Sequence, residues 1–241
     1  MSQPRSAGGG ATQPGTAREV ARRLPQLLAG LWIFGMGLGF VVLGGQGQGP
    51  WVVWDEGVSL HTPLTIGTVA ILTGLALVAG LISAREPIGF GTLMNALVVG
   101  LSTDVTLALF DQPASVFGQV ALTLVSPWLV ALGSGLYLGV MLGPGPRDGV
   151  MTALHRRGVP IWLARFIIEA VPFTIGAILG GTVGWGTVYW LVVIGPAVNL
   201  GMKFFSWPRV PSRWIDVFNA LGARSQAVRR TSRRRPGPPS L

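Results

Sequence analysis

The sequence contains no cysteine, only two histidines, and few charged residues, which make up 11% of its 241 residues. The absence of cysteine excludes disulfides, iron–sulfur clusters and thiolate zinc sites. His61 and His155 both fall beside expected loops, so the sequence offers no histidine cluster for a metal site or a buried catalytic triad. We therefore expect no metal, no cofactor and no enzymatic activity.

Apolar residues are abundant instead, at 49% of the chain with a mean hydropathy of +0.55. A soluble protein of this size needs more polar surface than that, so the composition indicates an integral membrane protein. A helix needs about 20 apolar residues to cross the hydrocarbon layer. Six segments meet this condition, namely 25–44, 64–83, 89–110, 119–142, 160–181 and 185–205.

The net charge of +9 is concentrated at the two ends and in alternate connections between the expected spans. Basic residues precede the first span, follow the sixth, and lie between the second and third and between the fourth and fifth. Basic loops favour the cytoplasmic side, so both termini are expected in the cytoplasm. Segments 1–23 and 208–241 are expected to be basic and mostly disordered, with the tail touching anionic lipid headgroups. The basic run Arg233-Arg234-Arg235 has no interleaved aromatic residues, which argues against nucleic acid as a partner.

Glycine and proline recur in the two halves of the chain, 24–110 and 111–207. Because each half holds three spans, the second copy would enter the membrane in the opposite sense to the first. We therefore predict an all-α membrane protein with six transmembrane helices in a 3+3 inverted repeat. The matched pairs are Gly47 and Gly143, Gly49 and Gly145, Pro50 and Pro146 at a spacing of 96, and Gly89 and Gly184, Gly91 and Gly186, Thr92 and Thr187 at a spacing of 95.

A short segment, too brief to span, follows each Gly-Pro loop, at 51–60 and at 147–157. Proline suits the first position of a helix, and Asp148 in a first turn interacts favourably with the helix dipole. We predict a short helix in each place, lying at the interface or dipping into the bundle. Its amino end, with Arg147 and the flexible Gly149 beside it, could attract an anion. The alternative is a tight connection in which glycine only permits close packing.

Polar residues inside expected spans are further candidates for transport or substrate binding, because each is costly in lipid unless paired or facing a cavity. Asp104 matches Asn199 at the spacing of 95, and a structural hydrogen bond is the alternative role of Asp104. Glu169 lies one helical turn after Arg165, so this pair is either a structural ion pair or a substrate or proton site. Asn95 is a weaker candidate.

Trp51 and Trp54 stand beside Asp55 and Glu56. The four residues could form an outer vestibule for a cation. An aromatic belt at the membrane interface is the competing explanation for the tryptophans.

Three motifs in order resemble the YczE/YyaS/YitT family of bacterial integral membrane proteins over about residues 27 to 205. They are Gly143-Pro144-Gly145-Pro146-Arg147-Asp148-Gly149-Val150-Met151-Thr152, Gly49-Pro50-Trp51 with Gly57-Val58-Ser59, and Gly89-Phe90-Gly91-Thr92 leading to Asp104. The short ending resembles the YczE branch. The resemblance implies a multi-pass protein of the bacterial plasma membrane and transfers no catalytic or binding residue.

Two functions follow as hypotheses. The inverted repeat and the polar residues within the spans favour a small-solute transporter or permease. The alternative is an accessory or regulatory membrane protein that acts through protein partners without transport. A homo-oligomer or a membrane partner is compatible with either hypothesis.

Overall fold

The computed structural model describes residues 17–84, 86 and 88–205, and these residues form eight α-helices. Disorder was expected over 1–23, of which 1–16 lie outside the described residues, as does the basic tail with its expected lipid contacts, whereas 17–23 belong to the first helix. The helices in chain order are α1 (Ala17–Gly44), α2 (Pro50–Ser59), α3 (Ile66–Ser83), α4 (Phe90–Leu109), α5 (Val116–Gly139), α6 (Pro146–Arg156), α7 (Ile161–Ile178) and α8 (Trp185–Phe205).

Six of these helices are long and apolar enough to cross a membrane, and they are the six spans expected from the sequence. The first of them counts as a span from Ala21 to Gly44, and the others are α3, α4, α5, α7 and α8. The two remaining helices, α2 and α6, are the short helices predicted after the Gly-Pro loops. The prediction of an all-helical membrane protein is confirmed in the described part of the chain.

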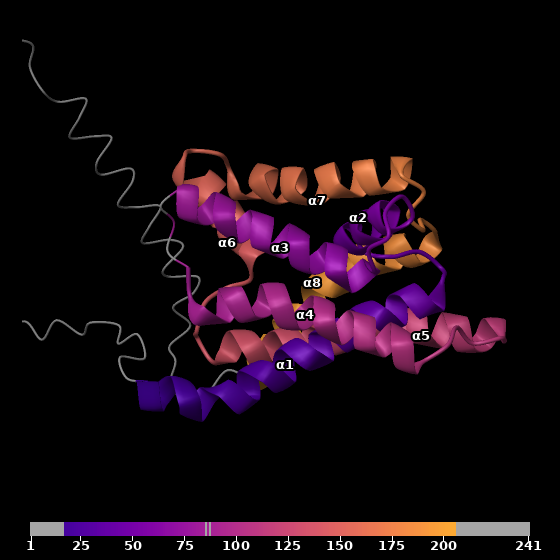
Figure 1. The fold of residues 1–241 in the computed structure, drawn as a ribbon, viewed down its shortest axis with the longest axis horizontal. Helices are drawn as coiled ribbons and strands as arrows, with labels where there is room; N and C mark the ends of the chain where they lie inside the picture. The colour runs from indigo at the N-terminus through magenta and orange to yellow at the C-terminus, as the bar shows by residue number, and fades with distance from the viewer. Residues whose placement is uncertain (1–16, 85, 87, 206–241) are drawn as a thin grey trace, which may run out of the picture.

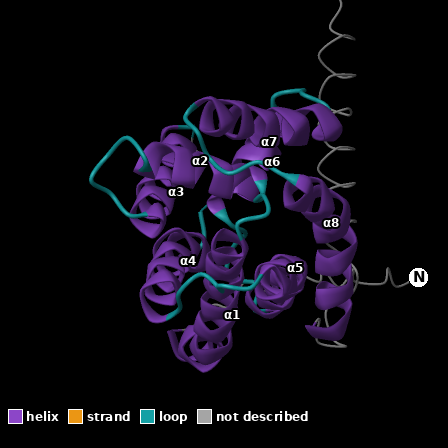
Figure 2. Ribbon diagram, turned by 90° about the vertical axis from the view of Figure 1, so that its right-hand side faces the viewer, coloured by secondary structure: helices purple, strands orange, loops and turns teal. Residues whose placement is uncertain are grey.

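The helices form two groups that lie side by side (Figures 1 and 2). In the first group, α1 packs against α4 and α5, and α5 packs against α8. In the second, α2 and α6 pack between α3 and α7. The groups are joined mainly where α3 packs along α4, with a smaller contact between α4 and α6. Each group therefore mixes helices from both halves of the sequence.

The two Gly-Pro loops are each held by the third long helix of the other half. Gly91 at the start of α4 donates its N–H to the Leu142 carbonyl at 2.9 Å, and Gly186 at the start of α8 donates to the Gln46 carbonyl at 2.8 Å. Beside these carbonyls, Gly143 has a φ of 127° and Gly47 a φ of 110°, a region that favours glycine. The spacing of matched glycines therefore corresponds to two matched sets of contacts.

Candidate functional site

The site lies where the first turns of α2 and α6 meet inside the bundle. Each helix begins with proline after an extended glycine, Gly49 before Pro50 and Gly145 before Pro146. Proline fixes the backbone angle that a first helical residue needs and lacks the N–H that would have no partner there. The residues that directly follow the two prolines are Trp51 and Arg147, and they touch.

Arg147 is the central residue of this junction. Its guanidinium carbon lies 4.3 Å from the centroid of the Trp51 ring, which is a cation–π distance. Its Nη2 lies 3.7 Å from Oδ2 of Asp55, one turn further along α2. Burial lowers the pKa of Arg147, and the carboxylates of Asp55 and Asp148 oppose that shift. Although protein atoms crowd around it, 30% of the side-chain surface remains accessible.

Asp55 is almost completely enclosed, with 1% of its surface accessible. Its Oδ1 has no hydrogen-bond partner among the described residues. Burial raises the pKa of Asp55 to about 7, and the Arg147 charge opposes this rise. A carboxylate buried without hydrogen bonds is costly in its charged form. Asp55 is therefore poised between its charged and neutral forms close to neutral pH.

Three polar side chains gather around Gly145, the residue before α6. A Cβ at this position would lie 3.4 Å from Asn95 Oδ1 and from the Tyr137 hydroxyl, and 3.5 Å from Asp148 Oδ2. At the matched Gly49, a Cβ would instead meet the indole of Trp190. Asn95 and Trp190 each stand five residues into α4 and α8, about 7 Å below the helix start at 1.5 Å per residue. Both short helices therefore begin below the ends of the long helices.

Glu56 fastens the loop before α2 to the connection between α7 and α8. Its Oε2 accepts hydrogen bonds from Gln48 Nε2 at 3.0 Å and from the Thr182 N–H at 2.5 Å, and its Oε1 accepts from the Thr182 hydroxyl at 3.1 Å. The other amide atom of Gln48, Oε1, is buried without a partner among the described residues. The sequence had suggested only a vestibule role for Glu56.

Arg165 and Glu169 form the expected ion pair on α7, with Nε and Oε1 3.1 Å apart. Both remain accessible, at 59% and 36% of their side-chain surfaces. Burial raises the pKa of Asp148, the guanidiniums of Arg147 and Arg165 lower it, and Glu169 raises it. Charges of alternating sign therefore run from this pair through Asp148 and Arg147 to Asp55.

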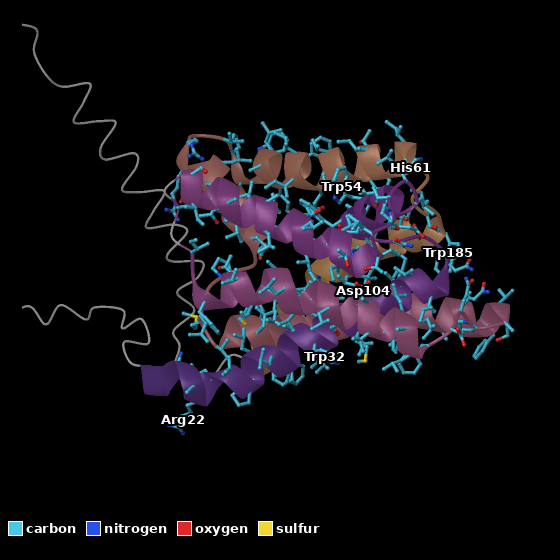
Figure 3. The ribbon with its side chains drawn as sticks, viewed as in Figure 1. Arg22, Trp32, Trp54, His61, Asp104 and Trp185 are labelled. Atoms are coloured by element: carbon cyan, nitrogen blue, oxygen red, sulfur yellow. The ribbon has the colours of Figure 1, made fainter. Side chains whose placement is uncertain are left out.

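Asp104, labelled in Figure 3, lies on α4 and caps the start of α3. Its Oδ1 accepts the Gly67 N–H at 2.7 Å, and its Oδ2 accepts the hydroxyls of Thr65 at 2.5 Å and Thr68 at 3.4 Å. These bonds satisfy donors that a helix start leaves open. The structural alternative for Asp104 thus agrees with the geometry. Its counterpart Asn199 lies on an exposed face of α8.

The junction combines three predicted site residues, Arg147, Asp148 and Asn95, with residues whose place at the site was not predicted. For Asp55 and Trp51 the sequence offers an outer vestibule or, for the tryptophan, an aromatic belt, and no sequence pattern marks Tyr137. A usable signal was present, because Trp51 and Arg147 occupy the same place after matched prolines at the spacing of 96.

Known proteins similar to this chain are membrane proteins or proteins described without a function. The sequence model of a family of unknown function, DUF6198, matches residues 21–203. An uncharacterized protein of Haemophilus influenzae is 33% identical over 187 residues, which cover 77% of this chain and 86% of the relative. The uncharacterized membrane protein YczE of Bacillus subtilis is 26% identical over 88% of this chain and 96% of its own length. The uncharacterized protein YyaS of the same organism is 23% identical over 72% and 89%. No solved structure matches.

Proposed function

The chain belongs to the DUF6198 family, the YczE/YyaS-like family of membrane proteins, and we propose that it is a small-solute permease with an inverted repeat and a solute site at the junction of α2 and α6. The six apolar helices and the membrane-protein relative support a polytopic membrane protein. The permease function rests on one observation above all. Arg147, Trp51 and the buried Asp55 meet where two helix amino ends converge.

The inverted repeat is supported by contacts that recur at the spacing of the sequence repeat. The bond from Gly91 to Leu142 and the bond from Gly186 to Gln46 join matched residues in exchanged halves. Thr92 and Thr187 each accept, through the hydroxyl, the N–H of the glycine three residues earlier at 3.3 Å. With three spans in each half, an inverted repeat would have one Gly-Pro loop on each side of the membrane. We propose the cytoplasmic side for both termini and for the loop before α6, because the basic residues lie there.

A site at this junction suits a permease because each loop would enter from its own side and start a half-length helix inside. The amino end of a helix carries a partial positive charge, and half-helices of this kind bind solutes in transporters with inverted repeats. The two groups of helices supply parts that could move against each other. One group carries Asp55, Arg147 and Asp148, whereas the other contributes Asn95, Tyr137 and Trp190.

Transport by the purified protein in liposomes tests this function. Uptake would be measured for a panel of anions, organic acids and cations, with and without a pH gradient. We expect Arg147→Gln to lower uptake of the transported solute roughly ten- to hundredfold, the effect of losing hydrogen bonds to a charged group. Arg156→Gln is the matched control on the same helix, because Arg156 pairs with Glu86 at 2.8 Å instead.

The opposite result would favour the accessory role. If the wild-type protein moved no solute in the panel and co-purified with a stable membrane partner, the permease function would be rejected. Equal uptake by the Arg147 and Arg156 variants would leave a permease but remove the solute site from the junction.

A further inference from the structure

The Arg147 guanidinium carries five N–H donors, and no hydrogen bond uses any of them among the described residues. Its contacts are the face of the Trp51 ring and the Asp55 carboxylate at 3.7 Å, which is beyond hydrogen-bonding distance. The guanidinium carbon lies over the Trp51 ring, and 30% of the Arg147 side-chain surface stays accessible to another group. A guanidinium edge matches a planar oxyanion in geometry.

Three ion pairs join described residues, and the Arg147–Asp55 pair differs from the others. Arg156 and Glu86 approach to 2.8 Å, and Arg165 and Glu169 to 3.1 Å, both with more accessible carboxylates. The Asp55 carboxylate is the most buried and the most distant from its partner, and its Oδ1 is unpartnered. Both members of this pair therefore keep unused hydrogen-bonding capacity, and on Asp55 this capacity is buried inside the bundle.

The charged groups around Asp55 are few. Arg147 reaches it from α6, while α3 has no titratable side chain. Glu56 on the same helix is bound to Gln48 and Thr182, and on α7 Arg165 and Glu169 pair with each other near Asp148. A proton on Asp55 would leave the charge of Arg147 without its nearest partner. An anion bound to Arg147 would in turn weaken the attraction that keeps Asp55 charged.

We propose that the junction binds a small planar monoanion of the carboxylate type on Arg147 together with a proton on Asp55, so that anion and proton are carried together. This assignment of solute class and coupling ion rests on the permease function proposed above. Each partner favours the other through the same coupling free energy, because linkage between two sites is reciprocal. The proton stays on Asp55 as the anion binds, and no covalent step is involved.

The expected pH dependence of anion binding follows from the direction in which a bound anion shifts the pKa of Asp55. With the pKa of Asp55 at about 7 in the free protein, and higher once an anion neutralises Arg147, binding takes up a proton between these two values. Affinity for the anion should therefore be constant below about pH 7 and fall by up to tenfold per pH unit above it.

Isothermal titration calorimetry on the full-length protein in detergent tests this, with sodium nitrate and sodium formate as probes. Titrations in buffers of different ionisation enthalpy give the number of protons taken up per anion. We expect uptake of up to one proton above pH 7. Asp55→Asn should bind with an affinity that is independent of pH and without proton uptake, and Arg147→Gln should bind roughly ten- to hundredfold more weakly than the wild type. Arg156→Gln should behave as the wild type.

The outcomes separate this inference from the permease function. Wild-type binding without proton uptake overturns the coupling, and no binding of either probe overturns the solute class, even if Asp55→Asn fails to fold. Proton-linked binding without flux in liposomes supports the site and rejects the permease. Flux in liposomes without proton-linked binding would support the permease and reject the proposed site.

Discussion

The two halves of the molecule differ in how closely their second and third long helices pack. We call the contact between α3 and α4 the first seam and the matched region between α7 and α8 the second seam. In the first half, Gly67 and Gly74 of α3 lie directly against α4, and a Cβ at Gly67 would overlap the Gly100 carbonyl. In the second half, α7 and α8, both described over their whole lengths, do not pack along each other in this way. A Cβ at Gly195, which matches Gly100 at the spacing of 95, would meet no atom of the described residues within 4 Å. The first seam is therefore closely packed, whereas the second seam is open, meaning that its two helices are not in close contact.

Side-chain size and charge explain this difference. At the spacing of 95, Gly67 is matched by Trp162, Ala70 by Arg165 and Gly74 by Glu169. Trp162 has 70% of its surface accessible, and Arg165 and Glu169 are accessible too. A tryptophan and an ion pair keep helices apart where glycine allows backbone contact. Their charges also border Asp148, so the open seam lies beside the solute site that we propose.

Disulfide cross-linking should show the largest contrast between the seams, and the absence of native cysteine makes the assay clean. A Cβ at Gly74 would lie 3.0 Å from the Ala96 Cβ, and a shift of roughly 0.5 Å would bring the two atoms into the range of about 3.5 to 4.5 Å that disulfides need. Gly74→Cys with Ala96→Cys should therefore form a disulfide on mild oxidation. The matched pair Glu169→Cys with Leu191→Cys should not. Gel mobility after cleavage of the chain between the helices measures both, and efficient cross-linking of the second pair would contradict an open seam.

Adding bulk to the matched glycines should give the next largest effect. Gly100→Leu forces a side chain against the Gly67 carbonyl and Ile71, and we expect a loss of about 3 kcal/mol in the free energy of unfolding, at the upper end for overpacking. Gly195→Leu enters open space and should be neutral or stabilising by up to about 1 kcal/mol. Denaturant unfolding in detergent compares the two. Equal losses would mean that the second seam closes in solution.

Substitutions at the matched residues Asp104 and Asn199 should show the smallest difference in the free energy of unfolding. Asp104→Ala removes the acceptors for Gly67, Thr65 and Thr68, and we expect a loss of about 1 to 2 kcal/mol. Asn199→Ala, on the exposed face of α8, should change the free energy of unfolding by less than about 0.5 kcal/mol. Thermal unfolding measures both, and Asp104→Asn should retain part of the stability. If the Asn199 variant lost as much, its side chain would have to cap α7.

The sequence predicted most of the helices because hydropathy over about 20 residues and the Gly-Pro signal are local properties. The Arg165–Glu169 pair was also within reach, since residues four apart share a helix face. The contact of Arg147 with Trp51 and Asp55 could not be predicted in this way, because it depends on how far each loop enters the bundle. Likewise, the cap formed by Asp104 depends on where α3 starts beside α4. The exposure of Asn199 depends on the separation of α7 from α8, which is a property of the tertiary packing and not of the local sequence.

The exchanged loops also bear on the order in which the protein can be assembled. The Gln46 carbonyl is held by the N–H of Gly186, about 140 residues later in the chain. Ribosomes make the amino end first, so the loop before α2 leaves the translocon long before α8 exists to fasten it. The second loop meets α4 already in place. The last step of folding in the first half should therefore wait for α8, and a chain truncated before α8 should leave the loop before α2 without its hydrogen bond to Gly186, although α2 itself still packs on α3 and α7.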